Sequence, residues 1–225
     1  MTLPKTIATW RMERPGALAR ADLPLPPPAP GEVVVAVAGC GVCHTDLGFF
    51  YDGVPTVNKA PLTLGHEISG TVVGGEPAWL GREVIVPAVL PCRSCWLCKT
   101  GRGNRCLSQK MPGSSLGVYG GFSSHIVVPA IDLCPVPDRR GLALAKLAVV
   151  ADAVTTPYQA AMRAALRPGA NVIGGGAAGG VGVYMPQIAP PLDAPVAEVV
   201  RAWCGLRGID PSAVRGFAAR LGFDV

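Results

Sequence analysis

The chain has 225 residues, 49% of them apolar and 16% charged, which is enough apolar material for a sizeable buried core. Residues 1–16 include Lys5, Arg11, Glu13 and Arg14 and lack the apolar stretch of a secretory signal, and the longest apolar run, residues 33–43, is about half as long as a membrane span. We therefore expect a cytoplasmic protein that does not contact a membrane.

The whole chain has a formal net charge of +5, and basic residues are concentrated in one stretch of it. Between Glu83 and Asp132 the sequence has no acidic residue, but it has five basic ones: Arg93, Lys99, Arg102, Arg105 and Lys110. Four cysteines share this stretch, and four thiolates around one Zn²⁺ leave a local charge of about −2 that nearby cations would balance. A patch facing an anionic ligand is the alternative, and nucleic acid is not expected as a partner.

The first part of the sequence predicts a small β domain. Residues 24–31 are rich in proline and are not expected to be helical. Short valine-rich runs follow, broken by glycine and proline, a pattern typical of strongly curved β structure. These runs are residues 32–38, 68–73, 83–89 and 124–128.

The pattern changes near residue 142. Residues 142–150 form an apolar helical stretch, and Thr155-Thr156-Pro157 is a typical helix start, with a hydroxyl cap and a proline in the first turn. This helix is expected to end at Arg167-Pro168-Gly169, before a short strand at residues 171–173. We therefore expect a β domain over residues 1–150, followed by a linker helix and an α/β unit over residues 151–225.

The eight cysteines indicate metal binding rather than disulfides, because several have C-x-x-C spacing and no secretory signal is seen. Four of them follow the pattern C-x₂-C-x₂-C-x₇-C on one short loop: Cys92, Cys95, Cys98 and Cys106. Such a set can complete a tetrahedral S₄ zinc site, which has no open position and therefore only stabilises structure. Four unligated thiols packed together are the alternative.

A second group of metal-ligand residues precedes this loop. Cys43 and His66 offer a thiolate and an imidazole, and Asp46 is suited to orient the second ring nitrogen of His66. A cysteine and a histidine so far apart in sequence do not by themselves define a metal site. A buried histidine with a purely structural role is the alternative.

The order of these motifs is more specific than any one of them. Cys43-x-x-Asp46, then Gly65-His66-Glu67, then the four-cysteine loop resembles the zinc-dependent medium-chain alcohol dehydrogenases, over roughly residues 30–185. The resemblance implies a mixed β and α/β fold, in which a GroES-like β-barrel catalytic domain precedes a Rossmann-type cofactor domain. It also implies two zinc ions per chain, one catalytic and one structural.

The resemblance assigns roles to single residues around the catalytic zinc. Cys43 and His66 would be ligands, and Glu67 would approach the metal when substrate is absent. Thr45 would hydrogen-bond the substrate oxygen and relay its proton, and His44 would touch the cofactor pyrophosphate. Many family members have a histidine at the end of the proton relay, where this sequence has Gly48.

A catalytic zinc needs a third protein ligand and an open position. The segment Ala151-Asp152-Ala153-Val154-Thr155-Thr156 resembles the part of the family that supplies an aspartate before a threonine-rich helix start. The resemblance therefore favours Asp152 as the third ligand. A helix-capping role for Asp152 is the alternative.

A glycine-rich run after the predicted strand indicates the opening of a dinucleotide-binding fold. Residues 174–179 match G-x-G-x-x-G, and Gly-Gly-Val-Gly at 179–182 resembles the family's fingerprint in a shifted register. The candidate cofactor-binding residues are Gly174, Gly176, Gly179, Gly180 and Gly182. Glycines at such a position allow a tight turn and the close approach of a pyrophosphate to a helix N-terminus. We therefore expect NAD as the cofactor.

The sequence after these glycines does not continue as a Rossmann fold should. Pro186 falls within the phosphate-binding helix, and neither Asp193 nor Glu198 follows a strand that could place it at the ribose. We expect an incomplete Rossmann-type domain in a chain that is truncated or internally deleted.

The resemblance implies zinc-dependent oxidation of a secondary alcohol with hydride transfer to NAD. Residues 43–56, 99–106, 120–125 and 149–158 are most similar to members that oxidise a cyclic hydroxyacyl-CoA thioester during anaerobic benzoyl-CoA degradation. An acyl-CoA substrate is expected, and the full-length protein is expected to be a homo-oligomer. A zinc-binding domain without catalytic activity is the alternative.

Overall fold

The computed structural model describes residues 3–117 and 119–167. The chain divides into two compact units, Met1–Thr155 and Thr156–Val225, so the described residues cover nearly all of the first unit and the start of the second. The predicted strand at residues 171–173 and the glycine-rich run lie outside the described residues. Within the described ranges, no helix is both long and apolar enough to cross a membrane.

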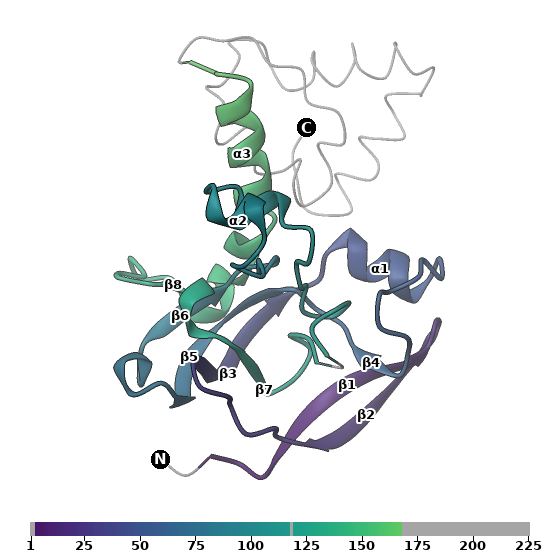
Figure 1. The fold of residues 1–225 in the computed structure, drawn as a ribbon. Coiled ribbons are helices and arrows are strands. Elements are labelled where there is room, and N and C mark those ends of the chain that lie inside the picture. The colour runs from purple at the N-terminus through teal and green to yellow at the C-terminus, as the bar shows by residue number, and fades with distance from the viewer. Residues whose placement is uncertain (1–2, 118, 168–225) are drawn as a thin grey trace. The chain divides into compact units, whose positions relative to one another are not determined.

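Two antiparallel sheets build the first unit (Figure 1). Their strand orders are β2-β1-β4 and β7-β3-β5-β6-β8. The strands are β1 (Thr6–Arg14), β2 (Ala17–Pro24), β3 (Glu32–Gly41), β4 (Leu62–Thr63), β5 (Glu67–Gly75), β6 (Glu83–Val86), β7 (His125–Pro129) and β8 (Cys134–Pro135). The α-helices are α1 (His44–Phe50), α2 (Trp96–Lys99) and α3 (Thr155–Arg163), and the 3₁₀ helices are η1 (Pro77–Trp79), η2 (Gly103–Arg105), η3 (Ala130–Asp132) and η4 (Leu144–Ala151).

The core lies around β3, which has a partner strand on each side. Val33, Val34 and Val35 are all fully buried, so this part of β3 is covered on both faces, and β-branched side chains suit such a strand. Backbone hydrogen bonds join the two sheets, because β1 also contacts the segment before β7: Ser124 N–H donates to Ala8 O at 2.8 Å and Trp10 N–H to Phe122 O at 2.9 Å. The result is a strongly curved, partly closed β structure.

The four valine-rich runs form β3, β5, β6 and β7, as predicted, although β6 ends at Val86. The hairpin of β1 and β2 was not predicted. Its pattern is hidden because the buried residues of β1 are Ile7, Thr9 and Met12, which break strict alternation, and because no residue of β2 is fully buried.

One helix prediction needs correction. The apolar stretch at 142–150 is helical, as predicted, and forms the 3₁₀ helix η4, whereas α3 ends at Arg163 rather than near residue 167. The earlier end of α3 coincides with Ala165, whose φ of 51° lies in the left-handed region.

Replacing a buried isoleucine should destabilise the protein more than replacing an exposed one. Ile126→Ala removes a side chain that is 1% exposed, and we expect it to lower the free energy of unfolding by about 2–5 kcal/mol. Ile131→Ala makes the same chemical change at a residue that is 70% exposed and should cost less than about 0.5 kcal/mol. Urea unfolding of both variants checks this, and equal losses would contradict the core assignment.

Candidate metal centres

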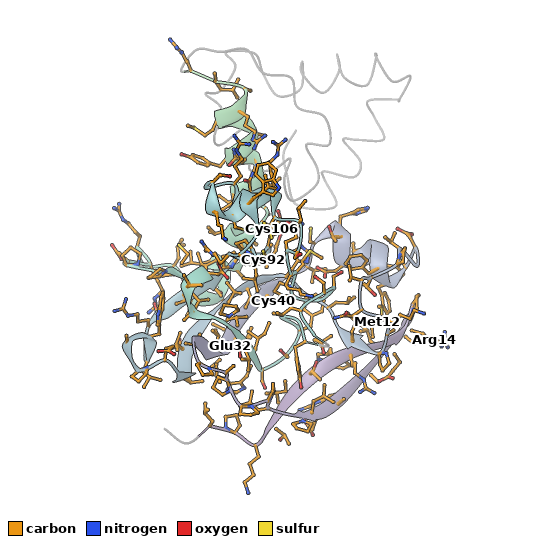
Figure 2. The ribbon with its side chains drawn as sticks, viewed as in Figure 1. Met12, Arg14, Glu32, Cys40, Cys92 and Cys106 are labelled. Atoms are coloured by element: carbon orange, nitrogen blue, oxygen red, sulfur yellow. The ribbon has the colours of Figure 1, made fainter. Side chains whose placement is uncertain are left out.

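The four-cysteine loop folds around its own backbone hydrogen bonds. Cys95 is the N-cap of the short helix α2, Arg102 N–H donates to Leu97 O at 2.8 Å, and Cys106 N–H donates to Gly103 O at 3.0 Å. Gly101, with φ of +76°, allows the turn after α2 that returns the chain towards Cys92. Cys92 and Cys106 lie beside each other as a result (Figure 2), with Cys92 N–H donating to Cys106 Sγ at 3.2 Å.

The four sulfur atoms have the spacing that a tetrahedral metal site requires. Zn–S bonds of about 2.3 Å separate tetrahedral sulfurs by about 3.8 Å. The measured Sγ–Sγ distances are 4.0 Å for Cys92–Cys98, 3.5 Å for Cys95–Cys98 and 3.9 Å for Cys95–Cys106, and none of the four is disulfide-bonded. The donor set therefore fits one zinc ion with no open position.

Local hydrogen bonds prepare this set for a cation. The Ser94 hydroxyl and the Cys95 N–H both donate to Cys92 Sγ, at 3.4 Å each, and they lower the pKa of Cys92 to about 5. The pKa of Cys98 is raised, by burial and by the neighbouring thiols. Four sulfurs this close cannot all be thiolates without a positive charge between them.

Arg93 has a different role from the other basic residues of the stretch. Its guanidinium forms an ion pair with Asp132 in η3, whose side chain is only 3% exposed, and the Nε–Oδ1 distance is 2.9 Å. This pair joins the Cys92–Cys95 turn to the segment after β7. That the remaining cations balance the thiolates stays a prediction.

Loss of one cysteine ligand should release one metal ion. We expect Cys95→Ser to reduce bound zinc from two ions per chain to one and to leave an aggregation-prone protein, because structural zinc contributes folding free energy directly. Cys134→Ser is the matched control, since Cys134 is exposed in β8 outside the cluster. Metal analysis of the purified variants decides, and a Cys95→Ser protein that keeps two zinc ions would overturn the assignment.

The second cluster brings together four side chains from distant parts of the sequence. Cys43, His66, Glu67 and Asp152 each direct one ligand atom into a space where all four atoms lie within 4.8 Å of one another. Cys43 is the N-cap of α1, His66 and Glu67 lie at the start of β5, and Asp152 directly follows η4. The sequence predictions for these four residues therefore fall on one site.

The spacing of these donors also fits zinc. Asp152 Oδ2 lies 3.5 Å from His66 Nε2 and 3.9 Å from Cys43 Sγ. A tetrahedral Zn²⁺ with bonds of about 2.0–2.3 Å would space such donors by about 3.3–3.8 Å. The structure thus places Asp152 against the other ligands.

Asp46 joins the two ligand-bearing segments. Its carboxylate, 2% exposed as a residue, accepts Cys43 N–H with Oδ2 and Gly65 N–H with Oδ1, both at 3.0 Å. The first bond closes the start of α1 as an N3 acid does in a capping box. Asp46 Oδ1 lies 3.5 Å from His66 Nδ1, too far for a good hydrogen bond, and this buried nitrogen has no other partner within the described residues. Asp46 therefore positions the ligands chiefly through the backbone.

The electrostatics of His66 show that the site favours a cation. Burial lowers the pKa of His66, but the Asp152 carboxylate, 3.5 Å from Nε2, and the Asp46 carboxylate, 3.5 Å from Nδ1, outweigh burial and raise the pKa to about 11. Anionic donors that hold a proton this firmly would also attract a divalent metal ion. The donor chemistry thus fits zinc, with Cys43, His66 and Asp152 as protein ligands.

Glu67 reaches the cluster because β3 offers no side chain opposite it. A Cβ on Gly41 would collide with Glu67 Oε2 and lie 3.1 Å from Glu67 Cβ, so glycine at this position leaves room for the carboxylate where it lies. Burial, followed by the Asp152 charge, raises the pKa of Glu67, and hydrogen bonding with the Ala153 backbone partly offsets this. The role of Gly41 was not predicted from the sequence. It becomes clear from the strand register, in which Gly41 is directly opposite Glu67 in the β3–β5 ladder.

The remaining predicted residues lie at the rim of this cluster. Thr45 is exposed, with Oγ1 3.7 Å from Cys43 Sγ, and His44 is exposed at the first position of α1. Gly48 leaves a gap in which a Cβ would meet only Val54 Cγ2 at 3.6 Å and Asp52 Oδ2 at 3.9 Å. The predicted cofactor glycines, residues 174, 176, 179, 180 and 182, lie outside the described residues.

Comparison with known proteins agrees with this geometry. Residues 29–138 match the alcohol dehydrogenase GroES-like domain. The chain is 35% identical over 133 residues to the starvation-sensing protein RspB of Escherichia coli, covering 56% of this chain and 38% of that protein. It is 33% identical over 177 residues to an NAD-dependent alcohol dehydrogenase of Sulfolobus acidocaldarius, covering 75% of this chain and 50% of that enzyme.

Solved structures give the same result. A cobalt- and zinc-bound thermostable alcohol dehydrogenase from Pyrobaculum aerophilum superposes with a TM-score of 0.72 at 28% identity, covering 81% of this chain and 56% of that one. The chain belongs to the medium-chain zinc-type alcohol dehydrogenase family. The predicted mixed fold with a GroES-like domain is confirmed, and the matched part spans half or less of the two sequence relatives.

Proposed function

We propose that the chain carries the catalytic metal site of a zinc- and NAD-dependent dehydrogenase that oxidises a secondary alcohol. The observation that carries this proposal is the convergence of Cys43, His66, Glu67 and Asp152 on one space, with all ligand atoms within 4.8 Å. Three of these groups suffice for a catalytic zinc, which keeps one position for substrate. The separate four-cysteine cluster has no such position.

Zinc at this site would supply a Lewis acid that lowers the pKa of an alcohol hydroxyl. Thr45 is the residue placed to handle the proton, because its hydroxyl is exposed and lies beside Cys43. It can accept a hydrogen bond from the substrate hydroxyl and pass its own proton outwards. Gly48 offers no side chain to continue the relay, and since Thr45 is itself exposed, water is proposed to take the proton from it.

Oxidation of the alcohol carbon also requires a hydride acceptor, and NAD is the proposed one. The relative from Sulfolobus acidocaldarius is named as an NAD-dependent enzyme, and a similar structure, an acetophenone reductase from Geotrichum candidum, was solved in complex with NAD. The glycine-rich run at residues 174–182 is the proposed pyrophosphate segment. His44, exposed at the start of α1, is proposed to meet the same pyrophosphate.

Removal of the imidazole ligand tests the catalytic site. We expect His66→Ala to bind one zinc ion instead of two and to lose roughly a thousandfold or more in NAD-dependent alcohol oxidation, because Lewis-acid stabilisation of the developing charge is worth several kcal/mol. His125→Ala is the control, since His125 lies in β7 and hydrogen-bonds Ser124 outside the cluster. Unchanged zinc content in His66→Ala would refute the proposed ligand set.

For the substrate we propose a cyclic secondary alcohol on a CoA thioester, specifically 6-hydroxycyclohex-1-ene-1-carbonyl-CoA oxidised to its 6-oxo product. This proposal is supported by the similarity of residues 43–56, 99–106, 120–125 and 149–158 to dehydrogenases of that reaction. Basic residues of the zinc loop offer partners for the CoA phosphates, notably Arg102 and Arg105.

Cobalt in the catalytic site would report substrate binding independently of hydride transfer. We expect the CoA thioester to change the visible spectrum of the Co²⁺-loaded chain at a concentration at least about tenfold lower than free cyclohexanol does, because the thioester adds contacts that are worth roughly 1.4 kcal/mol. Thr45→Val should weaken both ligands by roughly 1 kcal/mol, since it removes one hydrogen bond.

The control for the hydroxyl is Thr6→Val, which changes an exposed threonine at the start of β1. A spectrum that responds equally to both alcohols would reject the CoA substrate and leave the dehydrogenase proposal standing. If neither alcohol changes the spectrum, the proposed site does not bind alcohols.

A further inference from the structure

Asp152 is the one ligand of the catalytic cluster that does not belong to the β3–β5 region itself. It directly follows η4, whose C-terminal end brings it to the other ligands. The position of Asp152 therefore depends on whatever holds η4 in place. Two residues that face each other across the β3–β5 ladder, Gly39 and Ser69, contact the start of η4.

Ser69 makes a specific bond to η4. Its side chain is fully buried, and Oγ donates to the carbonyl oxygen of Leu144 at 2.8 Å. A serine hydroxyl with no access to water is costly unless it is hydrogen-bonded, so this bond specifies where the first residue of η4 must lie. Leu144 itself is 8% exposed and anchors the same end by packing.

Gly39 lets η4 approach the sheet closely. A Cβ at this position would lie 2.6 Å from Ala145 O, 2.7 Å from Ala145 Cα and 2.8 Å from Ala145 Cβ, distances that force a shift of the backbone. Gly39 is the direct ladder partner of Ser69. At this pair, Gly39 on β3 leaves room for η4, and Ser69 on β5 donates a hydrogen bond to it.

The other end of the same segment is held near the metal cluster. Gly41 and Glu67 are the ladder partners two residues further along, and the Glu67 carboxylate interacts with the Ala153 backbone next to Asp152. Ala148, 2% exposed, and Ala153, 6% exposed, pack the stretch between and beyond these anchors. A 3₁₀ helix has poorer internal hydrogen-bond geometry than an α-helix, so the placement of η4 depends on such external contacts.

We propose that Gly39 and Ser69 are positioning residues that seat η4 so that its C-terminal end presents the Asp152 carboxylate to the catalytic metal. This inference rests on the proposed catalytic site. Neither residue touches the metal or the substrate. Both act through the location of η4, and their effect is specific to the catalytic ion and absent from the four-cysteine ion.

The test measures metal affinity in the purified chain by competition with a chromophoric zinc chelator. Ser69→Ala should weaken the catalytic zinc by about 10- to 100-fold, the range typical for loss of a group that orients a ligand, and should leave the structural zinc unchanged. Ser123→Ala is the matched control, because Ser123 is also a buried serine that donates to backbone carbonyls, of Gly120 at 2.7 Å and His125 at 2.8 Å. It should bind both ions as the wild-type chain does, at comparable loss of thermal stability.

A double-mutant cycle separates positioning from general destabilisation. In an Asp152→Asn background, Ser69→Ala should cause no further loss of catalytic-metal affinity, because its effect is transmitted through the Asp152 carboxylate. Additive losses would overturn the proposal, as would a Ser69→Ala chain with unchanged affinity. Gly39→Ala is a second test, because its Cβ would displace η4 at Ala145. We expect it to weaken the catalytic zinc as Ser69→Ala does, while the structural zinc stays bound.

The wild-type chain distinguishes this proposal from the one on which it depends. If the wild-type chain binds only the structural zinc, the catalytic-site proposal fails. If it binds both ions and the Ser69→Ala and Gly39→Ala chains also bind both with wild-type affinity, only the positioning role of Gly39 and Ser69 is overturned.

Discussion

The antiparallel pairing of β3 with β5 is the constraint on which the catalytic cluster depends. The register places Gly41 opposite Glu67, and Cys43 follows β3 by two residues while His66 directly precedes β5. Two ligands that are far apart in sequence are therefore close in space at one end of one ladder. A slip of one residue would turn every side chain of β5 to the opposite face, so the register and the metal site are specified together.

The same ladder explains why its small residues matter. Gly39 and Gly41 lie on one side of β3 with no side chains, and Ser69 and Glu67 face them from β5. Glycine inside a strand normally weakens it, and the usual reason to retain it is the close approach of another backbone or group. Here the approaching groups are the η4 backbone at Ala145 and the Glu67 carboxylate. The two glycines are unfavourable for the strand itself, but the space they leave is occupied by η4 at Gly39 and by the Glu67 carboxylate at Gly41.

Sequence alone identified most ligands but not how they are held. Spacing was sufficient for the four-cysteine loop, because all of its donors lie on one short segment with the periodicity that a tetrahedral site needs. The catalytic set required a family resemblance, since no local rule links Cys43 to Asp152. Asp46 was assigned to the His66 ring, whereas its hydrogen bonds go to the Cys43 and Gly65 backbones, because the path of the chain between two segments is not encoded in either one.

The fold shows the same limit. Valine-rich runs buried on both faces are easily recognised, and they form β3, β5, β6 and β7. In the β1–β2 hairpin, β2 is an edge strand without buried residues and the buried residues of β1 break strict alternation, so the pattern is weak. The position of η4 involves tertiary contacts that no local pattern encodes, among them the Ser69–Leu144 hydrogen bond and the close approach of Ala145 to Gly39.

All ligands of both metal clusters lie in the first compact unit, since the last of them, Asp152, precedes its end at Thr155. Metal binding is therefore a property of the β unit, whereas hydride transfer needs a cofactor that the glycine-rich run of the second unit is proposed to hold. The two properties depend on different parts of the chain, so either one can be altered without the other.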